Sequence, residues 1–430
     1  MTKLSQKSLL LFNAQVIDPF SQTDAIGSLL VTEEGVSFVP QDQELPTASQ
    51  TIDLSGKWAV PGLIDMHVHL REPGEEYKET IVSGAKAAVA GGFTAVACMP
   101  NTVPPTDGQQ AVKLILHKAA QADAKVYPIG SISKGLQGHE IAEFGEMLAA
   151  GAVAFSDDGR PVSNSQLMRR AMEYALNYGC TLISHSEELS LCHKGAMNEG
   201  EYSTRLGLRG IPRAAEEIAV YRDLALANYT GCPLHLAHIS TKESVSLIRR
   251  AKQKGWPVTA ETAPHYFSLT EEAIGRYDTY AKMNPPLRTQ ADVEAIIEGL
   301  QDGTIDAIAT DHAPHSDLEK ILEFDLAANG IIGLETAVSL VLKLVREKRI
   351  SPLKMVELLS MNPAGILGVE GGKLFDGGTA DITVIDPARK YTYRRENVVS
   401  KSKNSPFLDW DFTGKAVMTI VAGRIVFNDL

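Results

Sequence analysis

The sequence predicts an α/β protein, a (β/α)₈ TIM-type barrel with a small β-sandwich domain built from both termini. Between residues 61 and 367, eight short apolar runs alternate with amphipathic stretches of roughly 10–17 residues, the pattern of repeated βα units. Residues 1–60 and 368–430 instead contain short β-type runs separated by turn signals, with almost no helical periodicity. We therefore predict a barrel domain over 61–367 and a composite domain from 1–60 plus 368–430.

The composite domain takes strands from both ends of the chain. The predicted strands are Leu9–Val16, Gly27–Val31, Gly35–Val39, Gln50–Leu54, Asp381–Ile385, Ala416–Val421 and Arg424–Phe427. Each run is rich in β-branched and apolar residues and ends near glycine, proline or polar residues, as strands do.

The barrel strands follow in order, each bounded by turn residues. They are predicted at Leu63–His69, Thr94–Met99, Lys125–Ile129, Val153–Phe155, Thr181–His185, Leu234–His238, Val258–Thr262 and Ile305–Thr310. Helices are predicted at Tyr77–Ala90, Gly108–Ala122, Gln166–Asn177, Pro212–Asn228, Thr241–Lys254, Ala291–Leu300 and Leu334–Glu347. This order gives the eight units of a closed barrel.

Polar residues stand at the ends of nearly all the predicted barrel strands. They are His67, His69, Asn101, Asp157, Asp158, His185, His238, Glu261 and Asp311. Barrel enzymes carry their chemistry at the C-terminal ends of the strands, so these residues are the candidates for the site.

The strongest local motif is the His67-Val68-His69 triplet at the end of an apolar strand. Side chains alternate along a strand, so both imidazoles face the barrel interior and can bind one metal ion. The alternative for this motif alone is a pair of hydrogen-bonded core histidines.

Three further strand ends favour the metal site. His185, His238 and Asp311 stand at equivalent heights, and four imidazoles with a carboxylate match the ligands of Zn²⁺. Asp158 completes the set, and one carboxylate can bridge two metal ions. Asp157 is the rival bridge, with a helix or loop cap as its other interpretation.

Arg71 follows His69 by two residues and is therefore expected to point into the same mouth. A guanidinium can bind a carboxylate through two parallel hydrogen bonds, which suits a substrate with a free carboxylate. As a surface residue it would only be solvated.

Charge and composition exclude several other functions. The net charge is −12 without a block of Lys or Arg, which argues against nucleic acid and against anionic membrane surfaces. No stretch approaches about 18 apolar residues, and the first residues lack a signal-peptide pattern. The cysteines, Cys98, Cys180, Cys192 and Cys232, show no C-x-x-C pairing and are expected as free thiols in the cytoplasm.

Several motifs together resemble the cyclic amidohydrolases of the amidohydrolase superfamily, and within them the dihydroorotases of the longer, first class. The motifs are PGLIDMHVHLREPG (61–74), MPNT (99–102), FSDDG (155–159), ISHSE (183–187), LAHIS (236–240), MNPPLR (283–288), ATDHAPH (309–315) and GLET (333–336). The resemblance covers nearly the whole chain.

The resemblance implies a site with one or two zinc ions, two being favoured. His67, His69 and Asp311 would hold one ion, His185 and His238 the other, and Asp158 would bridge them. Many relatives bridge through a carboxylated lysine, but Gly151–Ser163 contains no lysine.

The resemblance also implies the substrate and its contacts. The reaction would be the reversible cyclisation of N-carbamoyl-L-aspartate to L-dihydroorotate in pyrimidine biosynthesis. Asn101 and His315 would join Arg71 around the substrate carboxylate, while Asn284 would face the ring. Asp311 is expected to take the proton of the attacking water and pass it to the leaving nitrogen.

Because side chains alternate along a strand, we expect His312 and His235 to point away from the mouth of the barrel. Helical or loop surroundings make His117, His139 and His193 bystanders. Glu261 and His265 receive no role.

The segment Pro314–Gly330 is long for a βα connection and is a candidate substrate loop. The family usually shows Ala-Pro-Phe-Gly where this chain has Ala327-Ala328-Asn329-Gly330. Without proline and phenylalanine the loop lacks a rigid, apolar anchor, so the sequence does not determine its closed conformation.

Two other functions remain as alternatives. Another cyclic amidohydrolase, such as a dihydropyrimidinase, hydantoinase or allantoinase, could use the same metal site on a different ring. A non-catalytic partner of aspartate carbamoyltransferase is the other, although such chains are expected to lack metal ligands. The resemblance and symmetry favour a homodimer, and an association with aspartate carbamoyltransferase stays open.

Overall fold

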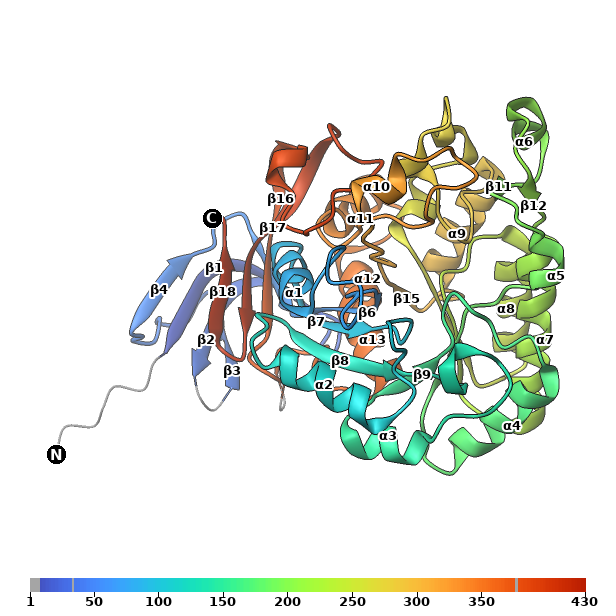
Figure 1. Cartoon of the computed structure of the whole chain (residues 1–430). Coiled ribbons are helices and arrows are strands. Elements are labelled where there is room, and N and C mark those ends of the chain that lie inside the picture. The colour runs from blue at the N-terminus through green and yellow to red at the C-terminus, as the bar shows by residue number, and fades with distance from the viewer. Residues whose placement is uncertain (1–7, 33–34, 376–377) are drawn as a thin grey trace.

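The computed structural model describes residues 8–32, 35–375 and 378–430, arranged as a barrel beside a separate sheet (Figure 1). The first seven residues of the predicted composite domain, which bear on the signal-peptide prediction, lie outside the described part. Within the described ranges, no helix is both long and apolar enough to cross a membrane. The predicted combination of barrel and second sheet is confirmed.

Eight parallel strands of the described chain form the barrel sheet, in sequence order around the ring. They are β6 (Leu63–Val68), β7 (Phe93–Cys98), β8 (Lys125–Gly130), β9 (Ala154–Ser156), β10 (Leu182–Ser184), β13 (Leu234–Leu236), β14 (Val258–Thr262) and β15 (Ala307–Ile308). A parallel bridge between Val68 and His312 brings the last unit back to the first. All eight predicted strands are present; four are shorter than predicted, and the others agree with the predicted bounds within one residue.

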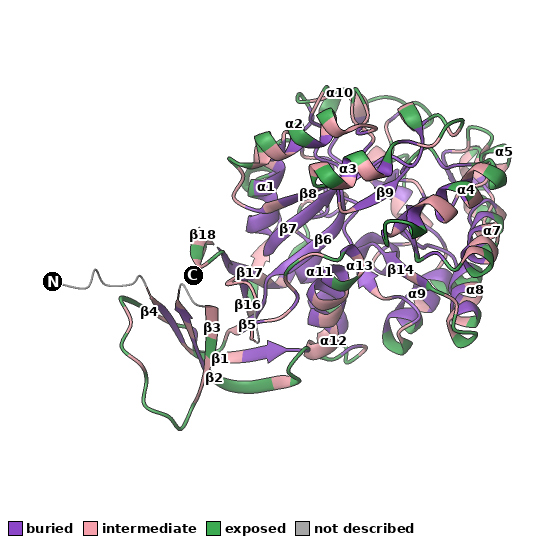
Figure 2. Cartoon of the chain, turned by 90° about the horizontal axis from the view of Figure 1, so that it is seen from below, coloured by how far each residue is buried: buried purple, intermediate pink, exposed green. Residues whose placement is uncertain are grey.

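Helices surround this sheet and bury one face against it (Figure 2). The longer helices are α1 (Ile81–Ala90), α2 (Gln109–Ala119), α4 (Ser165–Leu176), α7 (Ala214–Thr230), α8 (Lys242–Gln253), α9 (Gln290–Asp302) and α11 (Ala337–Arg346). In α8 the buried residues Ser244, Val245, Ile248 and Ala251 follow helical spacing, so they form one face.

Shorter elements fill the connections. They are α3 (Phe144–Ala150), α5 (Leu189–Cys192), β11 (Met197–Asn198), α6 (Glu201–Leu206), β12 (Gly210–Ile211), α10 (Asp317–Lys320), α12 (Pro352–Val356) and α13 (Asn362–Leu367). Small inward residues such as Ala95, Ala97 and Ala154 pack with Ile64 and with Leu367 of α13 in the interior of the barrel. The interior is therefore a packed core below the site.

The second sheet takes strands from both ends of the described chain, which run side by side in Figure 1. It contains β1 (Leu9–Asp18), β2 (Thr23–Thr32), β3 (Gly35–Pro40), β4 (Gln50–Asp53), β5 (Trp58–Pro61), β16 (Ile382–Thr392), β17 (Asp411–Val421) and β18 (Arg424–Asn428). Antiparallel pairing of β5 with β16 joins the two ends. The chain leaves this sheet at Pro61 and enters the barrel at Leu63.

Hydrogen bonds attach the second sheet to the first unit of the barrel. The hydroxyl of Thr383 accepts from the Leu63 amide at 3.2 Å and donates to the Gly92 carbonyl at 2.6 Å. The Thr419 hydroxyl donates to the Val89 carbonyl at 2.7 Å. These contacts hold the strand that carries His67 and His69 at its base.

Candidate metal centre and substrate pocket

The six predicted metal ligands come together at the C-terminal ends of the barrel strands. They lie at or just after the ends of β6, β9, β10, β13 and β15, and all are buried: His67, His69, Asp158, His185, His238 and Asp311. Parallel strands end at the same rim of a barrel, so residues up to 244 positions apart in the sequence become neighbours.

One group contains His67, His69 and Asp311. The Asp311 Oδ1 atom lies 3.0 Å from His69 Nε2 and 3.7 Å from His67 Nε2. The ligand atoms of all three residues lie within 4.8 Å of one another, so one cation can contact them together.

A second group surrounds the Asp158 carboxylate. Its Oδ1 lies 3.3 Å from His238 Nε2 and 3.4 Å from both His185 Nδ1 and His67 Nε2. Its Oδ2 lies 3.5 Å from His69 Nε2. Asp158 therefore sits between the two groups and faces both.

The chemistry of this cluster fits a divalent cation. His67 Nε2 is buried without a hydrogen-bond partner, and His185 Nδ1 faces His238 Nε2 at 2.9 Å. Burial alone lowers the pKa of His67, but the Asp158 and Glu261 carboxylates outweigh it and raise that pKa well above its usual value. Such a cluster demands positive charge, which a bound metal supplies in place of protons.

Asp157 points elsewhere. Its Oδ1 accepts hydrogen bonds from the amides of Ile132 at 2.7 Å and Ser133 at 3.0 Å, and the Ser133 hydroxyl donates to its other oxygen. Burial raises the pKa of Asp157 to about 6. These contacts match the alternative interpretation of Asp157 as a loop cap.

Two polar residues accept hydrogen bonds from the Nδ1 atoms of His67 and His69. His67 Nδ1 donates to Glu261 Oε1 at 2.7 Å, and His69 Nδ1 donates to Asn101 Oδ1 at 2.9 Å. Asn101 also donates to the Asp158 carbonyl at 3.3 Å. Sequence reasoning left Glu261 without a role, since its partner lies 194 positions away.

The predicted outward orientation of His235 is wrong. Its Nε2 lies 3.3 Å from Glu261 Oε2, and its Nδ1 lies 2.8 Å from Thr259 Oγ1, both on the inner side of β14. The prediction extended strand alternation back from His238. Strand β13 ends at Leu236, however, and His238 has a positive φ of 37°, so the alternation does not continue to it.

The remaining histidines separate into three kinds. His312 turns from the metal ligands and faces Glu79, with 3.6 Å between His312 Nε2 and Glu79 Oε2. Burial lowers the pKa of His265 to about 4, so its ring is neutral. The predicted bystanders are exposed: His117, His139 and His193.

Arg71 and His315 meet on one side of the site. Arg71 Nη2 lies 3.2 Å from His315 Nε2, Arg71 Nε donates to the Pro314 carbonyl at 3.1 Å, and His315 Nε2 donates to the Asn329 carbonyl at 2.7 Å. Among the described residues, no carboxylate oxygen lies within 4.0 Å of the Arg71 guanidinium, although its side chain is buried. Burial lowers the pKa of Arg71, and four carboxylates favour its charged form from beyond 4.0 Å: Glu75 most, then Asp311, Glu319 and Asp158.

Asn284 lies against the second metal group. Its Nδ2 donates to Glu187 Oε2 at 3.2 Å, and that oxygen is 3.4 Å from His185 Nε2. Asn284 Oδ1 is buried without a hydrogen-bond partner in the described structure. This oxygen is a free acceptor beside the predicted metal ligands.

Hydrogen bonds from two lysines hold the backbone of the loop 314–330, which lacks the Pro-Phe pair. Lys320, which is buried, donates from Nζ to the carbonyls of Ala328 at 2.7 Å and Gly330 at 3.1 Å. Lys282 Nζ donates to the Ala327 carbonyl at 2.7 Å. Two ammonium groups thus bind the backbone on both sides of Asn329, whose carbonyl contacts His315.

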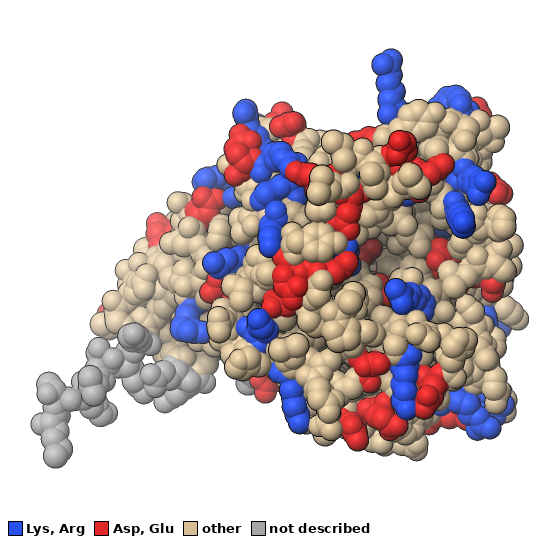
Figure 3. Space-filling model, in the orientation of Figure 1, with Lys and Arg blue, Asp and Glu red and all other residues tan. Residues whose placement is uncertain are grey.

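The surface around the barrel carries mixed charge. On the face in Figure 3, Lys and Arg are interspersed with Asp and Glu, and the barrel side is hollowed, with both signs near the rim of the recess. This face has no broad basic patch of the kind that binds nucleic acid.

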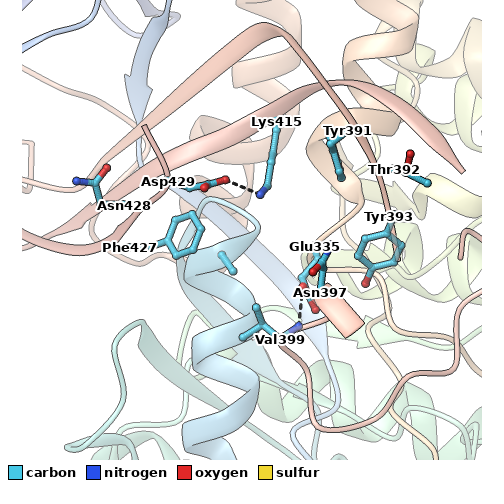
Figure 4. A pocket seen from close by; sticks show the side chains of 11 residues that line it. Glu335, Tyr391, Thr392, Tyr393, Asn397, Val399, Lys415, Phe427, Asn428 and Asp429 are labelled. Carbon is cyan, nitrogen blue, oxygen red and sulfur yellow. Dashed lines mark hydrogen bonds and ion pairs between the residues drawn. The ribbon is translucent and has the colours of Figure 1, made fainter. Parts of the chain in front are cut away.

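A separate cavity of about 450 Å³ lies between the second sheet and the barrel (Figure 4). Lys415 pairs with Asp429 at 2.7 Å across it, and Glu335 accepts from the Val399 amide at 2.9 Å. None of the predicted site residues lines this cavity. It is distinct from the cluster at the barrel rim.

Comparisons with known proteins give a consistent family. Residues 56–244 match a family model described as dihydro-orotase-like. A dihydroorotase of Geobacter metallireducens is 54% identical over 98% of this chain and 100% of its own length, and one of Desulfotalea psychrophila is 58% identical over 86% and 88%. Among solved structures, an L-hydantoinase (dihydropyrimidinase) from Arthrobacter aurescens has a TM-score of 0.88 at 26% identity, covering 99% of this chain and 96% of that one.

Proposed function

The chain belongs to the dihydroorotase family, and we propose that it interconverts N-carbamoyl-L-aspartate and L-dihydroorotate in pyrimidine biosynthesis. It is a hydrolase of cyclic amides, and full-length similarity to dihydroorotases supports this substrate. Hydantoinases share the fold, so the choice between ring substrates depends on the groups that face the substrate.

The single observation that carries the proposal is the buried Arg71 guanidinium, which has no carboxylate oxygen within 4.0 Å among the described residues. A buried cation that lacks an anionic partner is costly, and a bound carboxylate would offset that cost through two parallel hydrogen bonds. Carbamoyl aspartate and dihydroorotate carry such a carboxylate, whereas hydantoin and dihydrouracil do not. His315, beside Arg71, would complete this side of the pocket.

The other polar groups suit the ring. The unpartnered Asn284 Oδ1 can accept a hydrogen bond from a ring N–H. Asn101 was predicted at the substrate carboxylate, but its contacts with His69 and Asp158 also support a role in orienting the metal ligands.

We propose two zinc ions as the metal. His67, His69 and Asp311 would hold one, His185 and His238 the other, and Asp158 would bridge them, as its position between the two groups supports. Bound there, the metal supplies a Lewis acid that polarises the amide carbonyl and lowers the pKa of water.

Asp311 would move the proton. The neighbouring His69 and His67 outweigh the effect of burial and hold the pKa of Asp311 below its usual range, so the carboxylate is ionised and can accept. It would take a proton from the attacking water as the C–N bond of the ring opens and deliver it to the leaving nitrogen. Ring closure reverses these transfers.

The assay that tests the proposal compares five substrates on the purified chain. We expect cyclisation of carbamoyl aspartate and opening of dihydroorotate to exceed hydrolysis of hydantoin, dihydrouracil and allantoin by at least about 10-fold in kcat/KM, the lower bound for a charge-assisted contact of roughly 1.5–3 kcal/mol. Comparable or higher rates on the rings without a carboxylate would identify a hydantoinase-type enzyme instead.

Finer features follow from the family and the sequence. We propose membership of the longer, first class of dihydroorotases, a homodimer, a cytoplasmic location and a catalytic domain over residues 61–367 beside a composite domain from 1–60 plus 368–430. Association with aspartate carbamoyltransferase is a further proposal, which co-purification with that enzyme would test.

A further inference from the structure

Glu261 contacts the Nδ1 side of the His67 ring, while the Nε2 atom of that ring faces the Asp158 and Asp311 carboxylates. It lies on β14, its side chain is almost fully buried, and its Oε1 accepts from His67 Nδ1 at 2.7 Å. Among the described residues, His67 is part of both three-residue clusters that could hold an ion, one with Asp158 and His238 and one with His69 and Asp311, so its orientation affects both.

The other carboxylate oxygen of Glu261 faces a second histidine. His235 Nε2 lies 3.3 Å from Glu261 Oε2, while His235 Nδ1 contacts the Thr259 hydroxyl at 2.8 Å. A hydroxyl can donate to Nδ1, which leaves the ring proton of His235 on Nε2. This nitrogen lies 3.3 Å from Glu261 Oε2 as a close contact outside hydrogen-bond geometry, and neither atom has a hydrogen-bond partner in the described structure. The row Thr259, His235, Glu261 and His67 thus connects the neighbouring strands β13 and β14 with β6 on the other side of β15.

The charge of Glu261 is compensated in place. Its two carboxylate oxygens lie 2.7 Å from His67 Nδ1 and 3.3 Å from His235 Nε2. It cannot itself be a ligand of the cluster, because it faces the Nδ1 side of the His67 ring rather than Nε2. His69, by contrast, has only the neutral amide of Asn101 behind it.

We infer that Glu261 is a positioning residue for the metal centre, and that His235 fixes its rotamer. By accepting the Nδ1 proton, Glu261 holds the tautomer in which the Nε2 lone pair of His67 faces both groups, and its charge increases the basicity of that nitrogen. Carboxylates behind metal-binding histidines act in this way in other proteins. The inference rests on the proposed metal site.

The test measures metal affinity rather than turnover. Stripped wild-type protein and the Glu261→Gln variant are titrated with Zn²⁺ against a chromophoric chelator, and the Co²⁺-loaded proteins are compared by visible absorption. We expect the dissociation constant of at least one ion to rise about 10- to 100-fold, with a changed Co²⁺ spectrum. Glu261→Asp, which keeps the charge but shortens the side chain, should fall between the two.

Glu335→Gln is the matched control, because Glu335 is a half-buried carboxylate that lines the separate cavity. It should bind Zn²⁺ like the wild type. Unchanged affinity and an unchanged Co²⁺ spectrum in Glu261→Gln would overturn the inference. If Glu261→Gln does not fold, His235→Gln decides: a severalfold weaker affinity supports the inference and a wild-type affinity overturns it.

The outcome separates this inference from the proposed function. If the wild type cyclises carbamoyl aspartate and Glu261→Gln binds metal normally, only the inference is wrong. If Glu261→Gln weakens metal binding while the wild type does not act on carbamoyl aspartate, the inference stands and the substrate is wrong.

Discussion

The Nη2 atom of Arg71 lies 3.2 Å from Nε2 of His315, and the same His315 nitrogen donates to the Asn329 carbonyl at 2.7 Å. Because Nε2 of His315 carries the proton that it donates to Asn329, it cannot also accept a hydrogen bond from the Arg71 guanidinium. This arrangement leaves Arg71 available for a substrate carboxylate at the side of the metal cluster.

Arg71→Ala should raise KM for carbamoyl aspartate and lower kcat/KM by about 10- to 100-fold, because a charge-assisted contact of roughly 1.5–3 kcal/mol is lost. Metal content should not change. Steady-state kinetics with metal analysis checks this, with Arg170→Ala on the outer face of α4 as the control. A wild-type KM in Arg71→Ala would remove the argument for a carboxylate substrate.

Asp311→Asn should fold and retain most of its metal but lose about 10²- to 10⁴-fold in kcat, the usual contribution of proton transfer. Asparagine keeps one oxygen for the metal but cannot accept the proton. Asp157→Asn is the matched control, because that carboxylate binds the loop amides of Ile132 and Ser133. A similar kcat loss in both variants would argue against the specific role of Asp311.

Lys320→Met should loosen the loop 314–330. It removes the donors to the Ala328 and Gly330 carbonyls, so the Asn329 carbonyl no longer holds His315 in place. We expect a severalfold higher KM and faster cleavage of the loop by protease, with Lys343→Met, an exposed site on α11, as the control. Equal protease resistance in both variants would show that other contacts close the loop.

Glu335 should make stability depend on pH. Burial outweighs its hydrogen bonds from Val399 and Ser400 and the nearby Lys403, and raises its pKa to about 7 from an ordinary 4.5, with Glu79 adding to the rise. The folded state therefore retains a proton that the unfolded state has lost. The stability from this group is present below about pH 4.5 and is lost as the pH rises through 7.

Chemical unfolding of wild type and Glu335→Gln between pH 4.5 and 8 isolates this effect. The difference in unfolding free energy, wild type minus variant, should decrease over that range by at most about 3 kcal/mol. A constant offset from the substitution does not matter, since only the slope is compared. A flat or rising difference would contradict the assignment.

The sequence predicted the elements and most of the site because both follow from short-range patterns. Apolar runs and turn residues placed the eight strands, and strand ends placed the candidate ligands. The orientation of His235 was predicted wrongly because strand β13 ends at Leu236. The alternation of side chains therefore does not extend to His238, from which the orientation of His235 was inferred. Glu261 and the loop lysines gained roles only through contacts with residues remote in the sequence.

The most direct test of the whole account is Zn²⁺ reconstitution of the chelator-stripped protein, with cyclisation of carbamoyl aspartate as the readout. The account predicts no measurable activity after stripping and recovery on addition of metal, complete at two equivalents per chain if both groups are filled. A thoroughly stripped protein that still closes the ring at the wild-type rate would contradict it.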